Sequence, residues 1–589
     1  MKFEKLLIKN FRNFENCEVR LTNKNLIFGM NDVGKSNMIH ALRMLFDYKV
    51  RNGEIFDTDF HNKNTTANIQ ISCFFKIEDS DDDNDSKKVI AKTKEAIDNI
   101  DDIFQIKLNI CKNNISNEYV SEMLWGTEDG LLEIRNIGVN KNLIDDLFHC
   151  IYIPSHNETY NNFKNFQKEL LSQHDSDISD EDIRSEINSS FSDINSSISR
   201  LSTVRSMESS INTHLEAFDE TYKVKLASKH SFGDFHSHLD FFIHDSDSSS
   251  DNPSLFPNAG DGRKRKVMYA MINYLLNHSK DIERKIPIVL IEEPENHLFL
   301  SSQIELSQTV FNEGFNKYLF LVTHSPQLFY KISNESNLIR LFKKDGSITA
   351  KSQTTIVNES YNSTKNILVE SLAHCLFVER VLLVEGPSEK VLFDWILDNI
   401  KLSTSLKSKI YVLNVVGVDF KRYLDILLNL GIEVILKTDN DVKKNRNTTH
   451  SAIGFNRCVE AFNLKKDESE ASMIKMESSN LSKEEIKFNI NEDTISLEQF
   501  YSKNIYLSTI DLEHDLAVAL NLENEIGTSF VDDLQEKKYH NMWSFISGSY
   551  DEVFSEAVTI HLKAMENEIP ERIFEDDNFK CLKVLTHEQ

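Results

Sequence analysis

Residues 25–37 read Asn-Leu-Ile-Phe-Gly-Met-Asn-Asp-Val-Gly-Lys-Ser-Asn, and they decide how the first half of the chain is built. A short apolar run leads into a G-x4-G-K-S loop, and the apolar residues that follow recur at helical spacing. In a strand–loop–helix of this kind, backbone N–H groups cradle phosphates, the lysine reaches the β and γ oxygens, and the hydroxyl binds Mg²⁺. We therefore expect a nucleotide site made by the following residues: Gly29, Asn31, Gly34, Lys35, Ser36 and Asn37.

Two further strand ends would complete this nucleotide site. Residues 288–295 form an apolar run that ends in Glu-Glu-Pro-Glu, where Glu292 would hold Mg²⁺ and Glu293 would polarise the attacking water. A third apolar run ends in Thr-His-Ser-Pro, which lets His324 reach the γ-phosphate. Taken alone, each of these is as readily an ordinary core strand or a structural histidine, but with the loop at Gly29 they favour a nucleotide-hydrolysing head.

The hydrophobic pattern also predicts the order of elements along the chain. Strands are expected at residues 5–8, 19–21, 25–28, 66–75, 286–291, 318–322 and 379–384, and helices at 36–46, 298–313 and 388–400. The acidic stretch 78–86 is predicted to be a surface loop, as is 244–254. Residues 155–235 are polar, with apolar residues three to five apart, which predicts a helical insertion. Residues 464–495 are expected to form a second, polar insertion.

The last third of the chain carries acids at three expected strand ends. Glu385 follows the strand at 379–384, and Glu389 opens the next helix. Residues 432–441 form an apolar strand that ends in Asp-x-Asp, and a third strand, 505–510, is followed by Asp-Leu-Glu. The acids on these two strands are Asp439, Asp441, Asp511 and Glu513. The carboxyl ends of parallel strands meet at one sheet edge, where ligands bind.

These clustered acids predict a metal site, because no group of basic residues neutralises them along the sequence. Carboxylates that lie together repel one another unless they are protonated or bind a cation. Oxygen ligands without Cys or His favour Mg²⁺ or Mn²⁺. Two such ions would activate water and stabilise the leaving oxygen of a phosphodiester.

The composition limits the partners and the compartment. A net charge of −27 over 589 residues argues against non-specific nucleic-acid binding by the whole surface, so DNA contact would rest on basic stretches at 263–266, 421–422 and 443–446. Seven cysteines without a CxxC pair argue against a disulfide framework and a zinc ribbon. The first residues lack the features of a signal peptide, and the apolar runs are too short to span a bilayer. A cytoplasmic protein is expected.

The first half of the chain resembles the ABC ATPases of the RecF/SMC type. The opening Ile-Lys-Asn-Phe-Arg-Asn-Phe at 8–14, the phosphate loop, the Glu-Glu-Pro-Glu strand end and the histidine loop recur in that family in this order. The resemblance implies a head that is split around an insertion and completed in trans by a signature loop, so at least a dimer is expected. The candidate loop contains Gly260, Asp261 and Gly262, preceded by Ala259 where related sequences have Ser. The missing hydroxyl would weaken hydrolysis more than binding.

The last third resembles the Toprim domain of topoisomerases, primases and nucleases. Fusion of a Toprim domain to a RecF-like head is typical of the overcoming-lysogenization-defect (OLD) nucleases. Within the OLD nucleases, this chain most resembles the nuclease subunits of Gabija anti-phage systems. The resemblance is carried by the segments "FGMNDVGKSN", "AGDGRK", "ERVLLVEGPSEK" and "KTDND". This resemblance implies a DNA endonuclease restrained by ATP or dNTP, with a UvrD-like helicase partner. It also implies metal ligands at Glu385, Asp439, Asp441 and Asp511, helpers at Glu389 and Glu513, and a phosphate-stabilising lysine at Lys538 or its neighbour Lys537.

The predicted fold class is α/β. An ABC-type head has lobes at 1–153 and 241–365, with a helical dimerisation insertion at 154–240 between them, and a Toprim domain follows at 366–589. The main alternative is an ATP-dependent DNA-clamping or repair protein of the RecF/SMC type, whose Toprim part binds without catalysis. A Toprim primase is expected to bring a zinc module, and a topoisomerase a nucleophilic tyrosine on a partner domain. Neither is found in the sequence.

Overall fold

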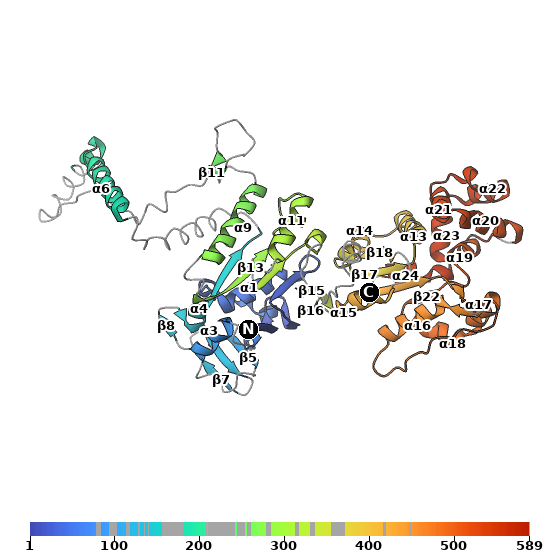
Figure 1. The fold of residues 1–589 in the computed structure, drawn as a ribbon, viewed down its shortest axis with the longest axis horizontal. Coiled ribbons are helices and arrows are strands. Elements are labelled where there is room, and N and C mark those ends of the chain that lie inside the picture. The colour runs from blue at the N-terminus through green and yellow to red at the C-terminus, as the bar shows by residue number, and fades with distance from the viewer. Residues whose placement is uncertain are drawn as a thin grey trace.

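The computed structural model describes two lobes, which Figure 1 shows side by side, the first coloured blue to green and the second yellow to red. Within the described chain, no helix is long and apolar enough to cross a membrane. The described residues are 1–77, 84–93, 103–113, 118–127, 130–134, 136–138, 141–155, 181–207, 209, 242–243, 254–255, 261–278, 284–311, 317–329, 336–344, 346–354, 372–415, 420–446, 449–522 and 524–587.

The first lobe begins with an antiparallel sheet whose inner face is rich in phenylalanine. Phe3 lies 4.8 Å from Phe75 and 5.2 Å from Phe320, measured between ring centroids, so this sheet packs directly on the second sheet. In spatial order its strands are β2 (Phe14–Arg20), β1 (Lys2–Phe11), β4 (Ile69–Lys76), β5 (Ile103–Lys112), β6 (Tyr119–Thr127) and β7 (Gly130–Glu133).

The second sheet of this lobe carries the three nucleotide motifs. Its first five strands are parallel, and the central ones are buried on both faces, which explains their continuous apolar runs. In spatial order the strands are β10 (Phe148–Ile153), β13 (Ile286–Glu292), β14 (Leu319–Val322), β3 (Lys24–Phe28), β15 (Ser336–Lys344) and the antiparallel β16 (Ser347–Thr354). The accompanying helices are α1 (Lys35–Phe46), α9 (Asp261–His278) and α11 (Leu300–Phe311).

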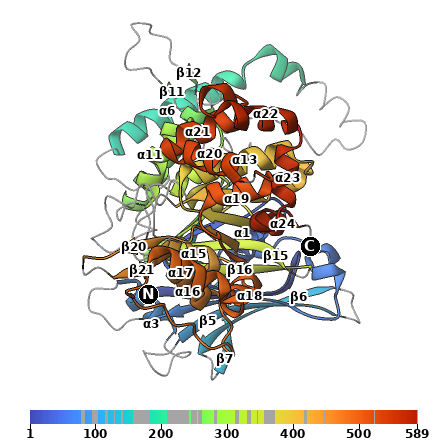
Figure 2. The ribbon, with the colours of Figure 1, turned by 90° about the vertical axis from the view of Figure 1, so that its right-hand side faces the viewer.

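The second lobe is built on a four-stranded parallel sheet in the order β18-β17-β19-β22. Helices cover both faces, and Figure 2 shows α20–α23 on one side of the lobe and α16–α18 on the other. The strands are β17 (Arg380–Val384), β18 (Ile410–Asn414), β19 (Glu433–Thr438) and β22 (Ile505–Leu507). The helices are α13 (Pro387–Asn399), α14 (Thr404–Lys407), α15 (Phe420–Asn429), α16 (Ile453–Lys465), α17 (Lys483–Glu492), α18 (Thr494–Ser502), α19 (Leu512–Ala519), α20 (Asn524–Glu536), α21 (Lys538–Ile546), α22 (Glu556–Met565), α23 (Ile569–Glu575) and α24 (Lys580–Thr586).

The expected strands and helices are confirmed, with shifts of a few residues at their ends, but two expectations are wrong. Residues 84–86 are not a surface loop, because they open helix α3 (Asn84–Thr93) and Asp85 is buried against Lys317 and Tyr318. The third acid-bearing strand is shorter than predicted, since β22 ends at Leu507. Asp511 is instead the N-cap of α19, where its side chain accepts a backbone N–H.

Of the two polar insertions, only the second lies entirely within the described residues. Helix α6 (Glu181–Ile198) lies in the expected helical insertion, most of which falls outside the described residues, as does most of the predicted loop at 244–254. Residues 466–482 form an extended connection that leads into α17. The dimerisation role of the first insertion therefore stays a prediction.

The two lobes share a buried contact beneath the phosphate-binding strand. The rings of Phe28, Phe329 and Phe377 pack together with centroids 5.3 to 5.9 Å apart. Phe28 is the last residue of β3, and Phe377 lies just before β17 of the second lobe. One apolar cluster thus runs from the first lobe into the second.

Candidate nucleotide and nuclease sites

The phosphate loop has the backbone that such a loop requires. Gly34 has a φ of 89°, and a Cβ there would come 2.2 Å from the amide nitrogen of Asn13, so only glycine fits. The Nζ of Lys35 curls over the loop and donates to the carbonyls of Gly29 at 3.0 Å and Met30 at 2.5 Å. Burial lowers the pKa of Lys35 to about 8, although Glu293 nearby acts in the opposite direction.

The end of β13 faces this loop, as the sequence predicts. Glu292 accepts hydrogen bonds from the hydroxyl of Ser36 at 3.2 Å and from the hydroxyl of Tyr152 at 3.3 Å. Burial raises the pKa of Glu292 above its usual value, and these two hydroxyls oppose that shift. Tyr152 was not predicted from sequence. It lies on β10, the parallel neighbour of β13, and the guanidinium of Arg43 covers its ring at 3.7 Å.

The histidine loop is fixed by a glutamate whose role the sequence did not reveal. Glu295 is buried, and its Oε1 accepts hydrogen bonds from Thr323 Oγ1, His324 N and Ser325 N at 2.7 to 3.1 Å. The ring of His324 then lies 3.5 Å from the carboxylate of Glu293. Burial lowers the pKa of His324, so the ring is neutral near pH 7.

The remaining residues predicted to bind nucleotide do not all face the phosphate loop. Asn31 is exposed on the loop, whereas Asn37 bonds the side chains of Arg12 and Asn13. Gly262 lies in the first turn of α9, where a Cβ would approach the carbonyl of His297 to 2.9 Å. Gly260 and Ala259 fall outside the described residues, and Asp261 is the first residue of α9.

In the second lobe, Glu385 is held over the end of the neighbouring strand. It follows β17, and its Oε1 accepts hydrogen bonds from Thr438 Oγ1 and from the backbone N–H of Asp439, the latter at 3.1 Å. Asp439 itself follows β19 directly. Two of the three predicted acid-bearing strands therefore place carboxylates side by side at the carboxyl edge of the sheet.

No group of basic residues neutralises the acids along the sequence, but in the fold two helices each bring a cation to them. Arg457 comes from α16 with a side chain only 9% exposed, and its Nη1 donates to Glu385 and lies 3.6 Å from Asp441. The side chain of Asp441 is 55% exposed. Arg457 is sixteen residues beyond Asp441, on a helix whose orientation the sequence pattern does not give.

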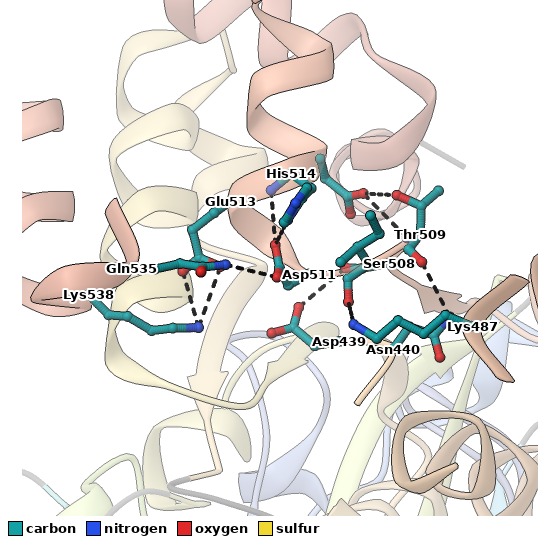
Figure 3. A network of polar contacts seen from close by, with 12 residues as sticks. Asp439, Asn440, Lys487, Ser508, Thr509, Asp511, Glu513, His514, Gln535 and Lys538 are labelled. Carbon is teal, nitrogen blue, oxygen red and sulfur yellow. Dashed lines mark hydrogen bonds and ion pairs between the residues drawn. The ribbon is translucent and has the colours of Figure 1, made fainter. Parts of the chain in front are cut away.

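The second cation is one of the two candidate lysines. Lys538 Nζ lies 3.2 Å from the buried carboxylate of Glu513, as Figure 3 shows. Lys537 is exposed and serves as the N-cap residue of α21. Burial lowers the pKa of Lys538, but Glu513 and Asp439 outweigh that effect, and the pKa is raised overall.

The acids form one electrostatic cluster. Burial raises the pKa of Glu389 to about 8, and the negative charge of Glu385 adds to this. Burial likewise raises the pKa of Asp439 well above its usual value, with further contributions from Glu389, Glu385 and Glu513. Carboxylates that resist ionisation in this way gain stability when a cation joins them.

Asp511 lies beside this cluster and has its own partners. It accepts hydrogen bonds from Gln535 at 3.0 Å and from the ring of His514 at 2.6 Å, and Figure 3 shows it facing Asp439. Ser508 Oγ bridges toward Asp439 at 3.4 Å. Asp511 thus lies near Asp439, although it reaches the site from the N-terminus of α19 and not from a strand end, while Asp441 is exposed and lies 3.6 Å from Arg457.

The acid cluster fits a hard divalent ion in its chemistry, because every candidate ligand is a carboxylate oxygen. Over the described part of the chain, however, no three acidic or metal-binding side chains already stand close enough together to hold an ion. The carboxylates would have to close in, with Glu385 exchanging its bond to Arg457. The metal roles therefore remain predictions.

Comparison with known proteins fits the arrangement of the two lobes. The family described as "AAA ATPase domain" matches residues 1–329, and the family described as "Overcoming lysogenization defect protein-like, TOPRIM domain" matches residues 376–441. Endonuclease GajA of Bacillus cereus (strain VD045) is 34% identical over 99% of this chain and 99% of its own length. The chain belongs to the GajA family of endonucleases. It is thus an enzyme, an ATPase-linked nuclease of the OLD type.

Two weaker likenesses accompany this match. The Old nuclease of Escherichia phage P2 is 25% identical over 32% of this chain and 33% of its own length. Among solved structures, the Smc head bound to the C-winged helix domain of ScpA covers 62% of this chain and all of its own, at 15% identity and a TM-score of 0.35. At that TM-score the structural likeness adds nothing to the family match.

Proposed function

We propose that this GajA-family chain is a divalent-metal-dependent DNA endonuclease of an anti-phage defence system. It nicks or cleaves double-stranded DNA, and ATP or dNTP bound to the head restrains this cleavage. The observation that carries the proposal is the cluster of Glu385, Glu389, Asp439 and Glu513, whose acids surround the end of β17 and β19 with Lys538 beside them. A cluster of this kind suits phosphodiester hydrolysis better than a purely structural role.

Each group has a role that follows from its position. Glu385, Asp439, Asp441 and Asp511 would hold one or two Mg²⁺ or Mn²⁺ ions, with Glu389 and Glu513 as helpers. Bound there, the ions supply a water of lowered pKa and stabilise the leaving oxygen. The remaining work belongs to the protein itself. Lys538, about half exposed, reaches out from Glu513 to bind the scissile phosphate, and Arg457 holds Glu385 over the strand end until a metal ion takes its place.

The head would act as a sensor. A bound triphosphate would draw Lys35 away from its loop carbonyls, because a phosphate oxygen is the stronger acceptor. Ser36 and Glu292 would hold its Mg²⁺, and Glu293 with His324 would face the γ-phosphate. The signature loop with Ala259 supports slow hydrolysis, which suits restraint by binding better than work by turnover.

A buried arginine offers a physical route from the head to the nuclease site. Arg340 on β15 pairs in register with Phe28, the residue before the phosphate loop. Its guanidinium donates to the carbonyls of Leu430, Gly431 and Val378 at 2.8 to 3.3 Å. Those carbonyls precede β19 and β17, the strands that carry the acids. A shift of β3 and β15 on nucleotide binding would therefore move both acid-bearing strands.

The family resemblance supports a proposal for the assembly and the partners. We propose the four regions 1–153, 154–240, 241–365 and 366–589 as head lobe, dimerisation insertion, head lobe and Toprim domain. We also propose that the head site is completed by a second copy, giving a dimer or tetramer, and that a UvrD-like helicase subunit acts with it in the cytoplasm.

The proposal is tested by cleavage of supercoiled plasmid DNA in Mg²⁺ or Mn²⁺. The parent is expected to nick or cut, and Glu385→Ala to abolish cutting while its melting curve stays that of the parent. The matched control is Glu379→Ala, which removes a half-exposed glutamate just before the start of the same strand and should cut normally. A Glu385→Ala variant that cuts at the parent rate would overturn the assignment.

A further inference from the structure

A short basic hairpin follows the Asp-x-Asp strand end directly. Strands β20 (Val442–Lys444) and β21 (His450–Ala452) pair antiparallel, and Lys443, Lys444 and Arg446 on this hairpin are exposed. In the part of the chain that the structure describes, no carboxylate pairs with these three side chains. Three exposed positive charges thus follow Asp441 within five residues, in a chain whose net charge is −27.

The hairpin is held in place by buried residues and by hydrogen bonds to a neighbouring segment. Val442 and Ala452 are buried at its base. The side-chain amide of Asn445 bonds the hydroxyls of Thr449, Ser451 and Ser478 at 2.7 to 3.2 Å. Backbone hydrogen bonds between His450 and Ser479 join β21 to the extended connection at 466–482. A prearranged group loses little conformational freedom on binding, so these charges are presented at low entropic cost.

The other two basic stretches are placed less favourably. Lys266 lies 3.7 Å from Glu305 on the head, and α9, which carries residues 263–266, belongs to the first lobe, away from the acids (Figure 1). Lys421 is at the start of α15, which packs against β16 of the head. The hairpin alone continues an acid-bearing strand; in Figure 2 its strands are labelled beside α17.

The reach of the hairpin fits a nucleic-acid backbone. Lys443, Lys444 and Arg446 are two, three and five residues beyond Asp441. At about 3.3 Å per extended residue this is roughly 7 to 17 Å along the chain. A DNA strand advances about 3.4 Å per nucleotide, so the charges can lie at most about two to five nucleotides from Asp441.

We propose that the β20–β21 hairpin binds the backbone phosphates of duplex DNA beside the scissile phosphate, through Lys443, Lys444 and Arg446. The contact is electrostatic and independent of sequence, because it involves exposed cations on backbone phosphates and no base edges. It deepens the proposed endonuclease function and rests on it. It also explains how a strongly acidic chain holds a polyanion, since the hairpin presents three exposed cations.

The test is salt-dependent DNA binding by the full-length chain. A fluorescein-labelled duplex is titrated without divalent metal, so that no cleavage occurs, and the anisotropy gives Kd at several KCl concentrations. Lys443→Gln/Lys444→Gln should weaken binding about ten-fold at low salt and reduce the slope of log Kd against log salt by about 1.8, since each lost phosphate contact removes about 0.9.

The matched control removes the same charge elsewhere on the lobe. Lys407 and Lys583 are half-buried and pair with Asp398 and Glu575, so Lys407→Gln/Lys583→Gln should leave the slope at the parent value. A hairpin variant with the parent slope, or a control that falls as far as the hairpin variant, overturns the proposal. The parent could fail to cut DNA in Mg²⁺ or Mn²⁺ while the hairpin variant still lowers the slope of log Kd against log salt. In that case the proposed nuclease function is wrong and the proposed DNA-binding surface is supported.

Discussion

A buried ion pair beneath the acid cluster gives the sharpest stability prediction. Lys437, on β19 next to Thr438, is 3% exposed, and its Nζ lies 2.7 Å from the fully buried carboxylate of Asp515. Asp515 in turn accepts the hydroxyl of Thr509 at 2.9 Å, which fixes the chain between β22 and α19. Lys437→Met leaves Asp515 buried without a counter-charge, which costs about 3–5 kcal/mol. For a lobe of roughly 200 residues this lowers Tm by about 6–20 °C.

Protonation of Lys437 sets the pH range in which this pair contributes. Burial lowers the pKa of Lys437, but Asp515 outweighs burial and the pKa is raised overall. A base with a raised pKa in the folded state stabilises fully below its unfolded pKa and loses that contribution only as the pH rises past the folded one. The pair therefore acts at full strength at neutral pH and weakens only in strong alkali.

The assay is thermal unfolding followed by tryptophan fluorescence, because Trp395 and Trp543 both lie in the second lobe. The control is Lys437→Met/Asp515→Leu, which replaces both charges by apolar groups and should recover most of the lost Tm. If the single variant melts within 2 °C of the parent (about 1 kcal/mol or less for a lobe of this size), or if the double variant melts lower still, the ion pair does not support the site as argued.

Three further predictions concern the roles of single cations. Lys538→Ala should reduce plasmid cleavage about 10²- to 10³-fold while Lys537→Ala stays near the parent rate, and equal losses in the two variants would contradict the placement of Lys538. Arg340→Leu should keep nucleotide affinity, measured with a fluorescent ATP analogue, but lose the restraint of cleavage by ATP; restraint of parent strength would exclude the Arg340 route. Because the pKa of Lys35 is lowered to about 8 and a bound phosphate favours its charged form, Kd for ATP should rise about ten-fold between pH 7 and pH 9. A Kd for ATP that does not change between pH 7 and pH 9 would contradict the assignment of this titration to Lys35.

Local patterns predicted the parts of the fold that depend on neighbouring residues. The phosphate loop could be predicted from sequence because the positive φ at position 34 requires glycine, and because the strand before the loop is short and apolar. The strands that end at Val384 and Thr438 were found for the same reason: burial on both faces requires an unbroken apolar run.

Contacts between distant segments could not be predicted in this way. Arg457 enters the acid cluster from α16, and Tyr152 reaches Glu292 across two parallel strands. Neither residue belongs to a motif, and the direction of each side chain depends on how its helix or strand packs. Asp511 was assigned to a strand end because Ile505–Leu507 is apolar and Ile510 extends the pattern, but the N-cap of α19 takes that position instead.

The central claim is that a nucleotide on the head restrains a metal-dependent nuclease in the second lobe. It is tested most directly by plasmid cleavage in Mg²⁺, with and without ATP, by the parent, Lys35→Ala and Asp439→Ala. The parent should cut, and ATP should suppress the cutting. Lys35→Ala should cut equally with and without ATP, because the loop no longer holds the phosphates, and Asp439→Ala should not cut. Cutting that ATP leaves unchanged or accelerates in the parent, or cutting by Asp439→Ala at the parent rate, would contradict the account.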